Sequence, residues 1–307
     1  MLEGISWFFQ NIAMAFVNFG YAVTHPSSWL NWSDKESLGR FIYYGASVEF
    51  FFVVFTLFLV LTLIGILKPA VMWVMVRGLE GVANLVGRTV AWVGLIMVLQ
   101  QIMIIFLQRI FRVASIEIGP FAPFGYPLIP GPSFAKDLSW WSEELKLWNA
   151  MIVCLCVTYT FVQGGHVRVD LLYANVKFRT KKVIDMFGAL FFMMTGAVLT
   201  WLFAWFFLWR SLVTPKVSAS ESLEMILRKA KVMKWNVETI GFSPNGFDAY
   251  FLFKILMVAF CALVFLHSIA FFWRSFLEFR EGETSENKYL DRDDPGEQST
   301  DGLVSTH

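Results

Sequence analysis

Five long stretches without Asp, Glu, Lys or Arg constrain this chain more than any other feature of its sequence. They cover residues 50–67, 89–108, 147–167, 186–209 and 255–273, and apolar side chains dominate each of them. A helix rises about 1.5 Å per residue, so about 20 apolar residues cross the roughly 30 Å hydrocarbon layer of a bilayer. Strands of an open sheet would leave unpaired backbone groups in lipid. The sequence therefore predicts an all-α integral membrane protein with about five transmembrane helices plus interfacial amphipathic helices.

The composition excludes an ordinary soluble domain. Hydrophobic residues make up 57% of the chain against about 45–50% in soluble proteins, and charged residues 16% against about 25%. A net charge of +1 gives no basis for a nucleic-acid partner. Cys154, Cys156 and Cys261 lie in apolar runs, and we interpret them as small buried apolar side chains.

Two segments before the second run have the pattern of helices lying at the membrane surface. In residues 4–33 a polar stripe that includes Ser6 and Gln10 lies opposite a row of phenylalanines. In residues 69–88 four polar side chains share one helix face, namely Arg77, Glu80, Asn84 and Arg88. Both segments are predicted to be interfacial, the second as an amphipathic arm on the cytoplasmic side.

A third amphipathic helix is predicted over residues 218–235. It opens with the capping-box pattern Ser218-x-x-Glu221. Glu224 precedes Arg228 by four residues, the favourable order for an ion pair on a helix.

Two other segments look irregular. Residues 119–133 are rich in proline and glycine, which predicts a non-helical loop outside the bilayer. The acidic tail after Arg280 has almost nothing apolar to bury, which predicts disorder.

These predictions together give the domain organisation of the chain. It consists of an N-terminal interfacial segment (1–43), an extra transmembrane helix (44–68), an arm helix (69–88), a four-helix core (89–275) with extramembrane insertions at 112–138 and 211–249, and an acidic tail (276–307).

The orientation follows from the positive charges next to the helix ends. The connection after the third run is the most basic one near the membrane, with Arg168, Lys177, Arg179, Lys181 and Lys182. This predicts a cytoplasmic position for that loop and for the C-terminus, and a periplasmic N-terminus.

Signs of catalysis or of a cofactor are absent from the sequence. It has no Walker loop, no H-E-x-x-H and no G-x-S-x-G, and no two of its four histidines share a helix face. We therefore predict no enzyme activity, no cofactor and no metal site.

Three polar residues lie at or inside the uncharged runs. Lys254 borders the fifth run and can reach the interface by snorkelling. Gln100 and Gln101 lie deep in the second run and suit hydrogen bonds between helices.

The second and third runs carry specific motifs at their ends. The second ends in Leu-Gln-Arg-Ile-Phe around Arg109, and Trp-Trp-Ser-Glu-Glu, residues 140–144, precedes the third. The third ends in Gly-Gly-His-Val-Arg-Val-Asp, residues 164–170. Each has a structural interpretation, since tryptophans anchor at the interface and a glycine pair can end a helix in a left-handed cap.

Together these motifs resemble the small permease (DctQ-like) subunit of tripartite ATP-independent periplasmic (TRAP) transporters, over roughly residues 77–275. The resemblance is strongest to the mannitol/chloroaromatic branch. Members of that family usually have four spans, so the span at 50–67 and the two insertions are departures. The matching positions are the candidate subunit-contact residues Arg109, Trp141, Glu144, His166, Arg168 and Asp170.

The resemblance implies partners in the bacterial inner membrane and the periplasm. They are a large permease subunit that carries substrate and coupling ions, in this family sodium, and a periplasmic binding protein that delivers an organic acid. The small subunit would be a fixed scaffold among membrane lipids, which agrees with five runs that contain no proline. The alternative is a non-transport scaffold or assembly subunit of another inner-membrane complex.

Overall fold

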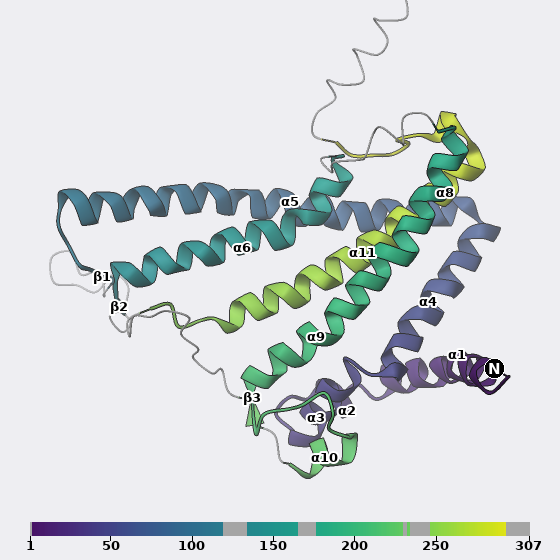
Figure 1. The fold of residues 1–307 in the computed structure, drawn as a ribbon, viewed down its shortest axis with the longest axis horizontal. Coiled ribbons are helices and arrows are strands. Elements are labelled where there is room, and N and C mark those ends of the chain that lie inside the picture. Colours follow the sequence, from purple (N-terminus) through teal and green to yellow (C-terminus); the bar gives the residue numbers. More distant parts are fainter. Residues whose placement is uncertain (1, 119–133, 165–175, 230–231, 234–245, 293–307) are drawn as a thin grey trace, which may run out of the picture.

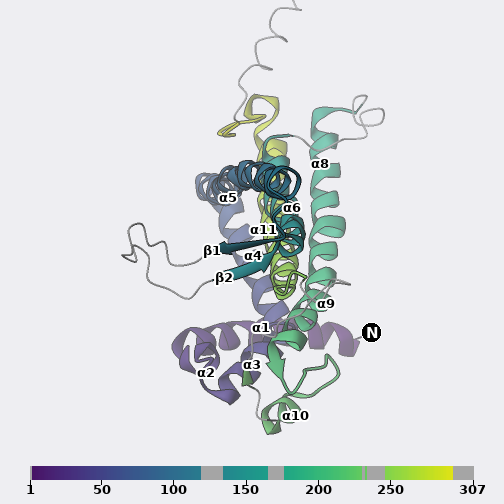
Figure 2. The ribbon, with the colours of Figure 1, turned by 90° about the vertical axis from the view of Figure 1, so that its left-hand side faces the viewer.

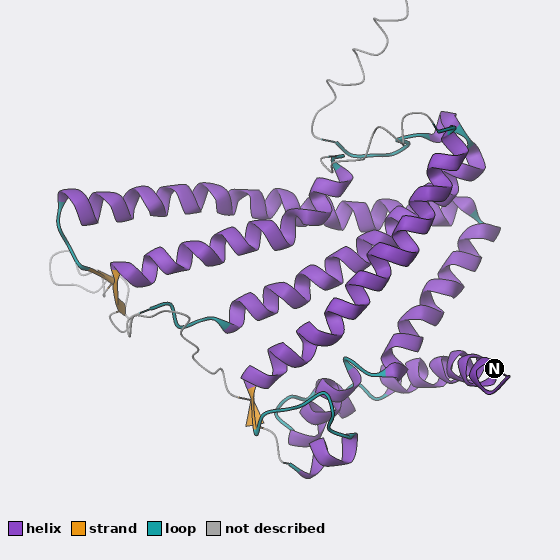
Figure 3. Ribbon diagram, viewed as in Figure 1, coloured by secondary structure: helices purple, strands orange, loops and turns teal. Residues whose placement is uncertain are grey.

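The computed structural model describes residues 2–118, 134–164, 176–229, 232–233 and 246–292, and these residues are mainly helical (Figure 3). The helices are α1 (Leu2–Thr24), α2 (Ser27–Leu30), α3 (Lys35–Tyr44), α4 (Val48–Leu67), α5 (Pro69–Ile105), η1 (Phe106–Ile110), α6 (Leu138–Val162), α8 (Phe178–Gly188), η3 (Ala189–Met194), α9 (Thr195–Leu212), α10 (Leu223–Arg228), α11 (Phe251–Glu281) and η4 (Glu283–Ser285). The strands β1 (Ser115–Ile118) and β2 (Phe134–Asp137) pair antiparallel, as do β3 (Val213–Thr214) and β4 (Val232–Met233).

Five helical segments are long and apolar enough to cross a membrane, which confirms the predicted all-α membrane fold. They are α4, α5 with η1, α6, the continuous helix from α8 to α9, and α11. The helices differ in length from the uncharged runs. The helix of the third run covers Leu138–Val162, so it begins before residue 147 and ends before residue 167, and the helix of the fourth run covers Phe178–Leu212. Charged residues extend these helices beyond the uncharged runs.

The spanning helices define two ends of the molecule (Figure 1). At one end α4, α6 and α11 begin and α9 ends; we call it the cap end. At the other, α4 and α6 end, α8 begins and α11 ends; we call it the strap end. Between them, buried residues of α4, α5, η3 and α11 form a shared core that includes Phe58, Met72, Met194 and Trp273.

The cap consists of α2, α3, α10 and the β3–β4 pair, which group together in both ribbon views (Figures 1 and 2). Its core joins Leu38 and Ile42 of α3 to Trp205 and Trp209 of α9. The indole of Trp205 donates to the carbonyl of Ile42 at 2.8 Å. The indole of Trp201 donates to the carbonyl of Gly45 at 2.8 Å. The N-terminal segment is thereby part of the folded body.

The helix predicted over residues 218–235 is much shorter in the structure. It begins after Ser222, whose hydroxyl caps Met225, and covers only Leu223–Arg228. The capping box at Ser218 was therefore wrong, and Glu221 pairs with Lys229 instead. The ion pair between Glu224 and Arg228 is confirmed, at 4.0 Å. Tertiary packing decides the length, because Ile226 is buried and its side chain lies against α3 at Gly39.

The segment predicted as a separate arm is continuous with the second span. Pro69 opens α5, and the helix runs without interruption to Ile105. Its polar face does not lie at a water interface throughout, because Glu80 and Asn84 are buried against other parts of the protein. Buried partners for these polar groups are thus supplied by α11 and the tail.

The tail is folded where the structure describes it, contrary to the predicted disorder. After α11 ends at Glu281, residues 282–292 turn back and contact α5; we call this segment the strap. Asp291 accepts a hydrogen bond from Asn84 and pairs with Arg88 at 3.0 Å. Residues 293–307, like 119–133 of the proline-rich segment, lie outside the described residues.

Lys254 also differs from its prediction. Its ammonium group is buried, donates to the Ser211 hydroxyl at 3.0 Å and lies 4.5 Å from the centre of the Phe207 ring. The lysine therefore ties α11 to α9 and does not reach out to the interface by snorkelling.

Candidate subunit-contact site

Gln100 brings two of the predicted contact residues together. Its amide nitrogen donates to the backbone carbonyl of Trp141 at 3.0 Å and to the carboxylate of Glu144 at 3.1 Å. Its amide oxygen accepts from the indole of Trp148 at 2.8 Å. An amide inside a span has no water to bind, so these partners hold α5 and α6 in a fixed register. The prediction of hydrogen bonds between helices is confirmed for Gln100, whereas Gln101 is exposed.

Arg109 is not brought to this cluster. It lies on the π-helical turn η1 and is exposed. Within the described residues no hydrogen bond or ion pair joins its guanidinium to Trp141 or Glu144. Its predicted contact role stays a prediction.

His166, Arg168 and Asp170 lie outside the described residues, so their roles also stay predictions. The residues just before them are described. Gly164 has a φ of +79°, the left-handed conformation expected of a glycine pair that ends a helix. The amide of Gln163 donates to the side-chain oxygen of Asn84 at 3.2 Å and to the carbonyl of Asp291 at 3.1 Å. The strap is thus anchored where α6 ends.

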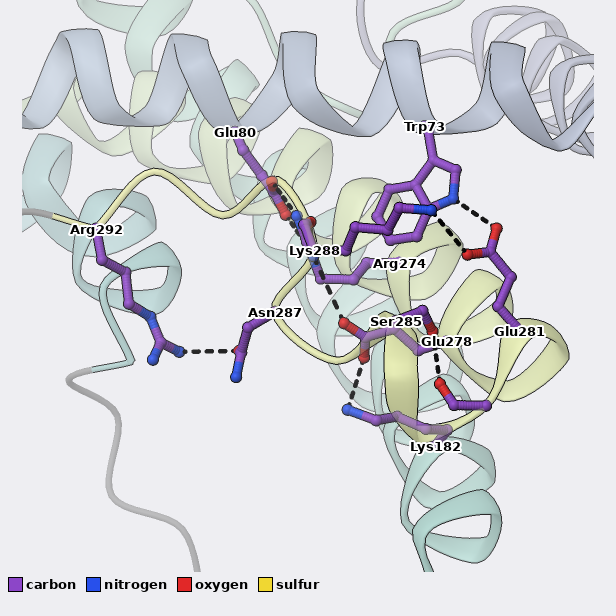
Figure 4. A network of polar contacts seen from close by, with 11 residues as sticks. Trp73, Glu80, Lys182, Arg274, Glu278, Glu281, Ser285, Asn287, Lys288 and Arg292 are labelled. Atoms are coloured by element: carbon purple, nitrogen blue, oxygen red, sulfur yellow. Dashed lines mark hydrogen bonds and ion pairs between the residues drawn. The ribbon is translucent and has the colours of Figure 1, made fainter. Parts of the chain in front are cut away.

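Four buried charges link three helices at the strap end (Figure 4). The guanidinium of Arg274 on α11 donates to both carboxylate oxygens of Glu80 on α5, each at 2.6 Å. It also approaches Glu278 at 3.5 Å, and Glu278 pairs with Lys182 of α8 at 2.7 Å. All four side chains are at most 9% exposed. We call these four residues the charge cluster.

The strap and the last residue of α11 complete the surroundings of the charge cluster. The carbonyl of Lys288 accepts from Arg274 at 3.0 Å, and the indole of Trp73 donates to Glu281 at 2.8 Å (Figure 4). Sequence reasoning missed this arrangement. Its only local signal is the spacing of Arg274 and Glu278, because Glu80 and Lys182 are distant in the chain.

Opposite the strap, at the cap end, the two insertions are joined by a second polar contact set. Lys136 pairs with Asp248 at 3.1 Å, and the indole of Trp140 donates to the same carboxylate at 2.9 Å. The backbone N–H of Phe247 donates to Glu143 at 2.6 Å, and the Phe247 ring is buried against Trp140. We call these five residues the latch.

The latch should weaken in acid. Burial raises the pKa of Asp248, but hydrogen bonds from Trp140 and Lys136 outweigh it and leave the pKa below the ordinary 3.8. A carboxylate with a lowered pKa stabilises the fold above its unfolded-state pKa, and this contribution is lost as pH falls through the folded value. We expect Asp248→Asn to lower thermal stability at neutral pH, with the difference from wild type shrinking below about pH 4. Thermal unfolding in mild detergent across this range measures it, and a pH-independent difference would contradict it.

Gln100→Leu should loosen the contact of α5 with α6. It removes the partner of Trp148 and Glu144 while keeping the helix apolar, and an orphaned buried polar group costs about 1–3 kcal/mol. Gln101→Leu is the matched control, since the neighbouring side chain is exposed and should change stability by less than about 0.5 kcal/mol. The free energy of unfolding of both variants in detergent tests this expectation. Equal losses of stability in the two variants would show that Gln100 has no special role.

Comparison of the sequence with models of known protein families gives one match. Residues 133–227 match the model of "Tripartite ATP-independent periplasmic transporters, DctQ component". Comparisons with curated proteins and with solved structures found no match. Residues 133–227 are therefore similar to the DctQ component of these transporters.

The DctQ match covers about a third of the 307-residue chain. It includes α6, α8 and α9, with Trp141 and Glu144, and it ends inside α10. It begins after Arg109 and after α4 and α5, the first two helices of spanning length, so the transporter branch and the assignment of α4 as an extra span remain predictions. In the ranges 2–118, 134–164, 176–229, 232–233 and 246–292, no three His, Cys, Asp or Glu side chains gather as a metal site.

Proposed function

We propose that this DctQ-like subunit is the fixed scaffold of a TRAP transporter in the bacterial inner membrane. It would hold a large permease subunit that takes up an organic acid with sodium, after delivery by a periplasmic binding protein. The family match is the observation that carries the proposal. The joined helices support it, because the Gln100 cluster and the charge cluster fix α5 against α6 and α11.

The orientation is part of this proposal. The strap end would be cytoplasmic, since Lys68, Lys177, Arg179, Lys181 and Arg280 lie near helix ends there. The cap would then lie on the periplasmic side, where a binding protein delivers substrate.

The decisive experiment is affinity purification of the tagged chain from its native membrane in mild detergent. Co-purification of a large multi-span protein supports the proposal. Recovery of a respiratory or assembly complex instead would favour the non-transport alternative and overturn it.

The predicted contact residues are tested by uptake. We expect Arg168→Ala or Asp170→Ala to reduce substrate uptake or the yield of the complex while membrane insertion stays intact. Gln101→Leu, on an exposed position outside the motif, is the control for expression. Wild-type uptake and yield in both motif variants would remove these residues from the contact site.

A further inference from the structure

Helix α1 crosses α4 near the point where α4 begins, at the cap end (Figure 1). Aromatic rings make this contact, with ring centres 5.4 Å apart for Trp7 and Phe52 and 6.0 Å apart for Phe8 and Phe55. Ala15, on the same side of α1, is 2% exposed. One side of α1 therefore packs against α4.

A second side of α1 is apolar and uncovered. Residues spaced four and three apart form one stripe along the helix, since a turn takes about 3.6 residues. The stripe consists of Ile5, Phe9, Ile12, Phe16, Phe19 and Val23. Phe9, Phe16 and Val23 are 64%, 58% and 62% exposed. A contiguous row of this kind in water would be unusual for a soluble surface.

The remaining side of α1 is polar in its first half, with Glu3, Ser6 and Gln10. Glu3 is the only Asp, Glu, Lys or Arg in residues 1–33. Helices recruited to anionic lipid carry lysine and arginine on their polar face, and α1 has none. Its surface therefore suits uncharged lipid and offers no positive charge to an anionic headgroup.

The side of α4 that contacts α1 is also apolar and exposed farther along the helix. Leu59 and Leu63 follow Phe55 by four and eight residues, on the same side of α4, and are 40% and 59% exposed. These α4 side chains belong to a helix of spanning length and composition. Lipid that covers α4 would therefore cover the stripe of α1 as well.

We propose that α1 lies flat in the bilayer interface at the cap end, with the stripe immersed among acyl chains and Ser6 and Gln10 directed to water. Apolar burial sets its depth, and headgroup charge does not. This inference is independent of the transporter role and goes beyond a general amphipathic pattern, because packing on α4 selects which side meets lipid.

The position of α1 at the membrane surface also determines where the cap lies. Only Trp29 and its neighbours separate α1 from α3, and the Trp29 indole donates back to the carbonyl of Ala22 at 3.0 Å. The cap is therefore held at the membrane surface by α1 as well as by α9.

The test uses the full chain with Cys154, Cys156 and Cys261 replaced by alanine, reconstituted in zwitterionic phosphatidylcholine nanodiscs. Spin labels are placed at single cysteines in the stripe (Phe9→Cys, Phe16→Cys, Phe19→Cys) and on the polar side (Ser6→Cys, Gln10→Cys). Collision with oxygen reports lipid, and collision with a water-soluble nickel chelate reports water. We expect a several-fold higher oxygen-to-nickel ratio at the three stripe positions than at the two polar positions.

The same labels are then measured with anionic phosphatidylglycerol added and at low and high salt. Unchanged ratios support insertion by apolar burial, whereas a deeper position with anionic lipid or low salt would overturn the neutral-lipid assignment. Nickel-accessible stripe labels would overturn the proposal by placing α1 in water. Stripe labels shielded from both reagents would overturn it by showing protein, such as a second copy, on the stripe. The co-purification experiment stays independent of each outcome.

Discussion

Glu80→Gln is expected to lower the free energy of unfolding by about 3–5 kcal/mol, because it leaves the buried Arg274 charge short of its main partner. The carboxylate of Glu80 takes two hydrogen bonds from Arg274, and both side chains are at most 9% exposed. Glutamine has nearly the same shape, so the loss reports charge and hydrogen bonding. Unfolding in mild detergent, followed by intrinsic fluorescence, measures it.

Two further variants make this expectation specific. Glu36→Gln breaks the pair with Arg40, whose side chains are 62% and 35% exposed, and should cost less than about 1 kcal/mol. The double variant Glu80→Gln with Arg274→Gln restores neutrality and leaves Glu278 paired with Lys182. Its loss should be smaller than the sum of the two single losses. Additive losses would show that the two charges do not interact in the folded protein.

Trp205→Ala is expected to cost about 3–5 kcal/mol, by leaving a cavity where a buried indole was removed. Trp205 is 7% exposed, packs against Phe41 and Trp209, and donates to the Ile42 carbonyl. The cap should therefore loosen more than the rest of the protein. Hydrogen exchange across α3, compared with α11, measures the local effect alongside global unfolding.

Two tryptophan controls separate cavity, hydrogen bond and lipid effects. Trp205→Phe keeps most of the ring but removes the donor, and should cost about 1 kcal/mol. Trp92→Ala removes a tryptophan that is 68% exposed on α5 and should change stability by less than about 0.5 kcal/mol. Similar losses in Trp205→Ala and Trp92→Ala would contradict a special role for Trp205 in the cap.

The spans were predictable because lipid imposes a simple requirement on long uncharged helices, and all five are present. Gln100 was predictable for the same reason, since an amide in a span needs a partner. The contacts of Glu80 and Lys182 were not, because their partners lie far away in sequence. A helix face that is polar in sequence can meet water or buried charge, and only tertiary packing distinguishes the two.

The same reasoning explains the errors in the extramembrane segments. The pattern at Ser218 is compatible with a cap, but the packing of Ile226 on α3 favours a later start at Ser222. The strap is acidic and poor in apolar residues, yet Asn84, Arg88 and Arg274 provide partners that a composition argument cannot anticipate.

The hydrogen bonds from α9 to the N-terminal segment also impose an order on synthesis. Trp205 reaches a carbonyl 163 positions earlier, and Trp201 one 156 positions earlier. A ribosome making this chain therefore releases α3 and three spans before the tryptophans that hold α3 exist. During that interval the carbonyls of Ile42 and Gly45 must bind other donors. The segment around α3 is thus made before three spans and yet completes its packing only after α9 is present.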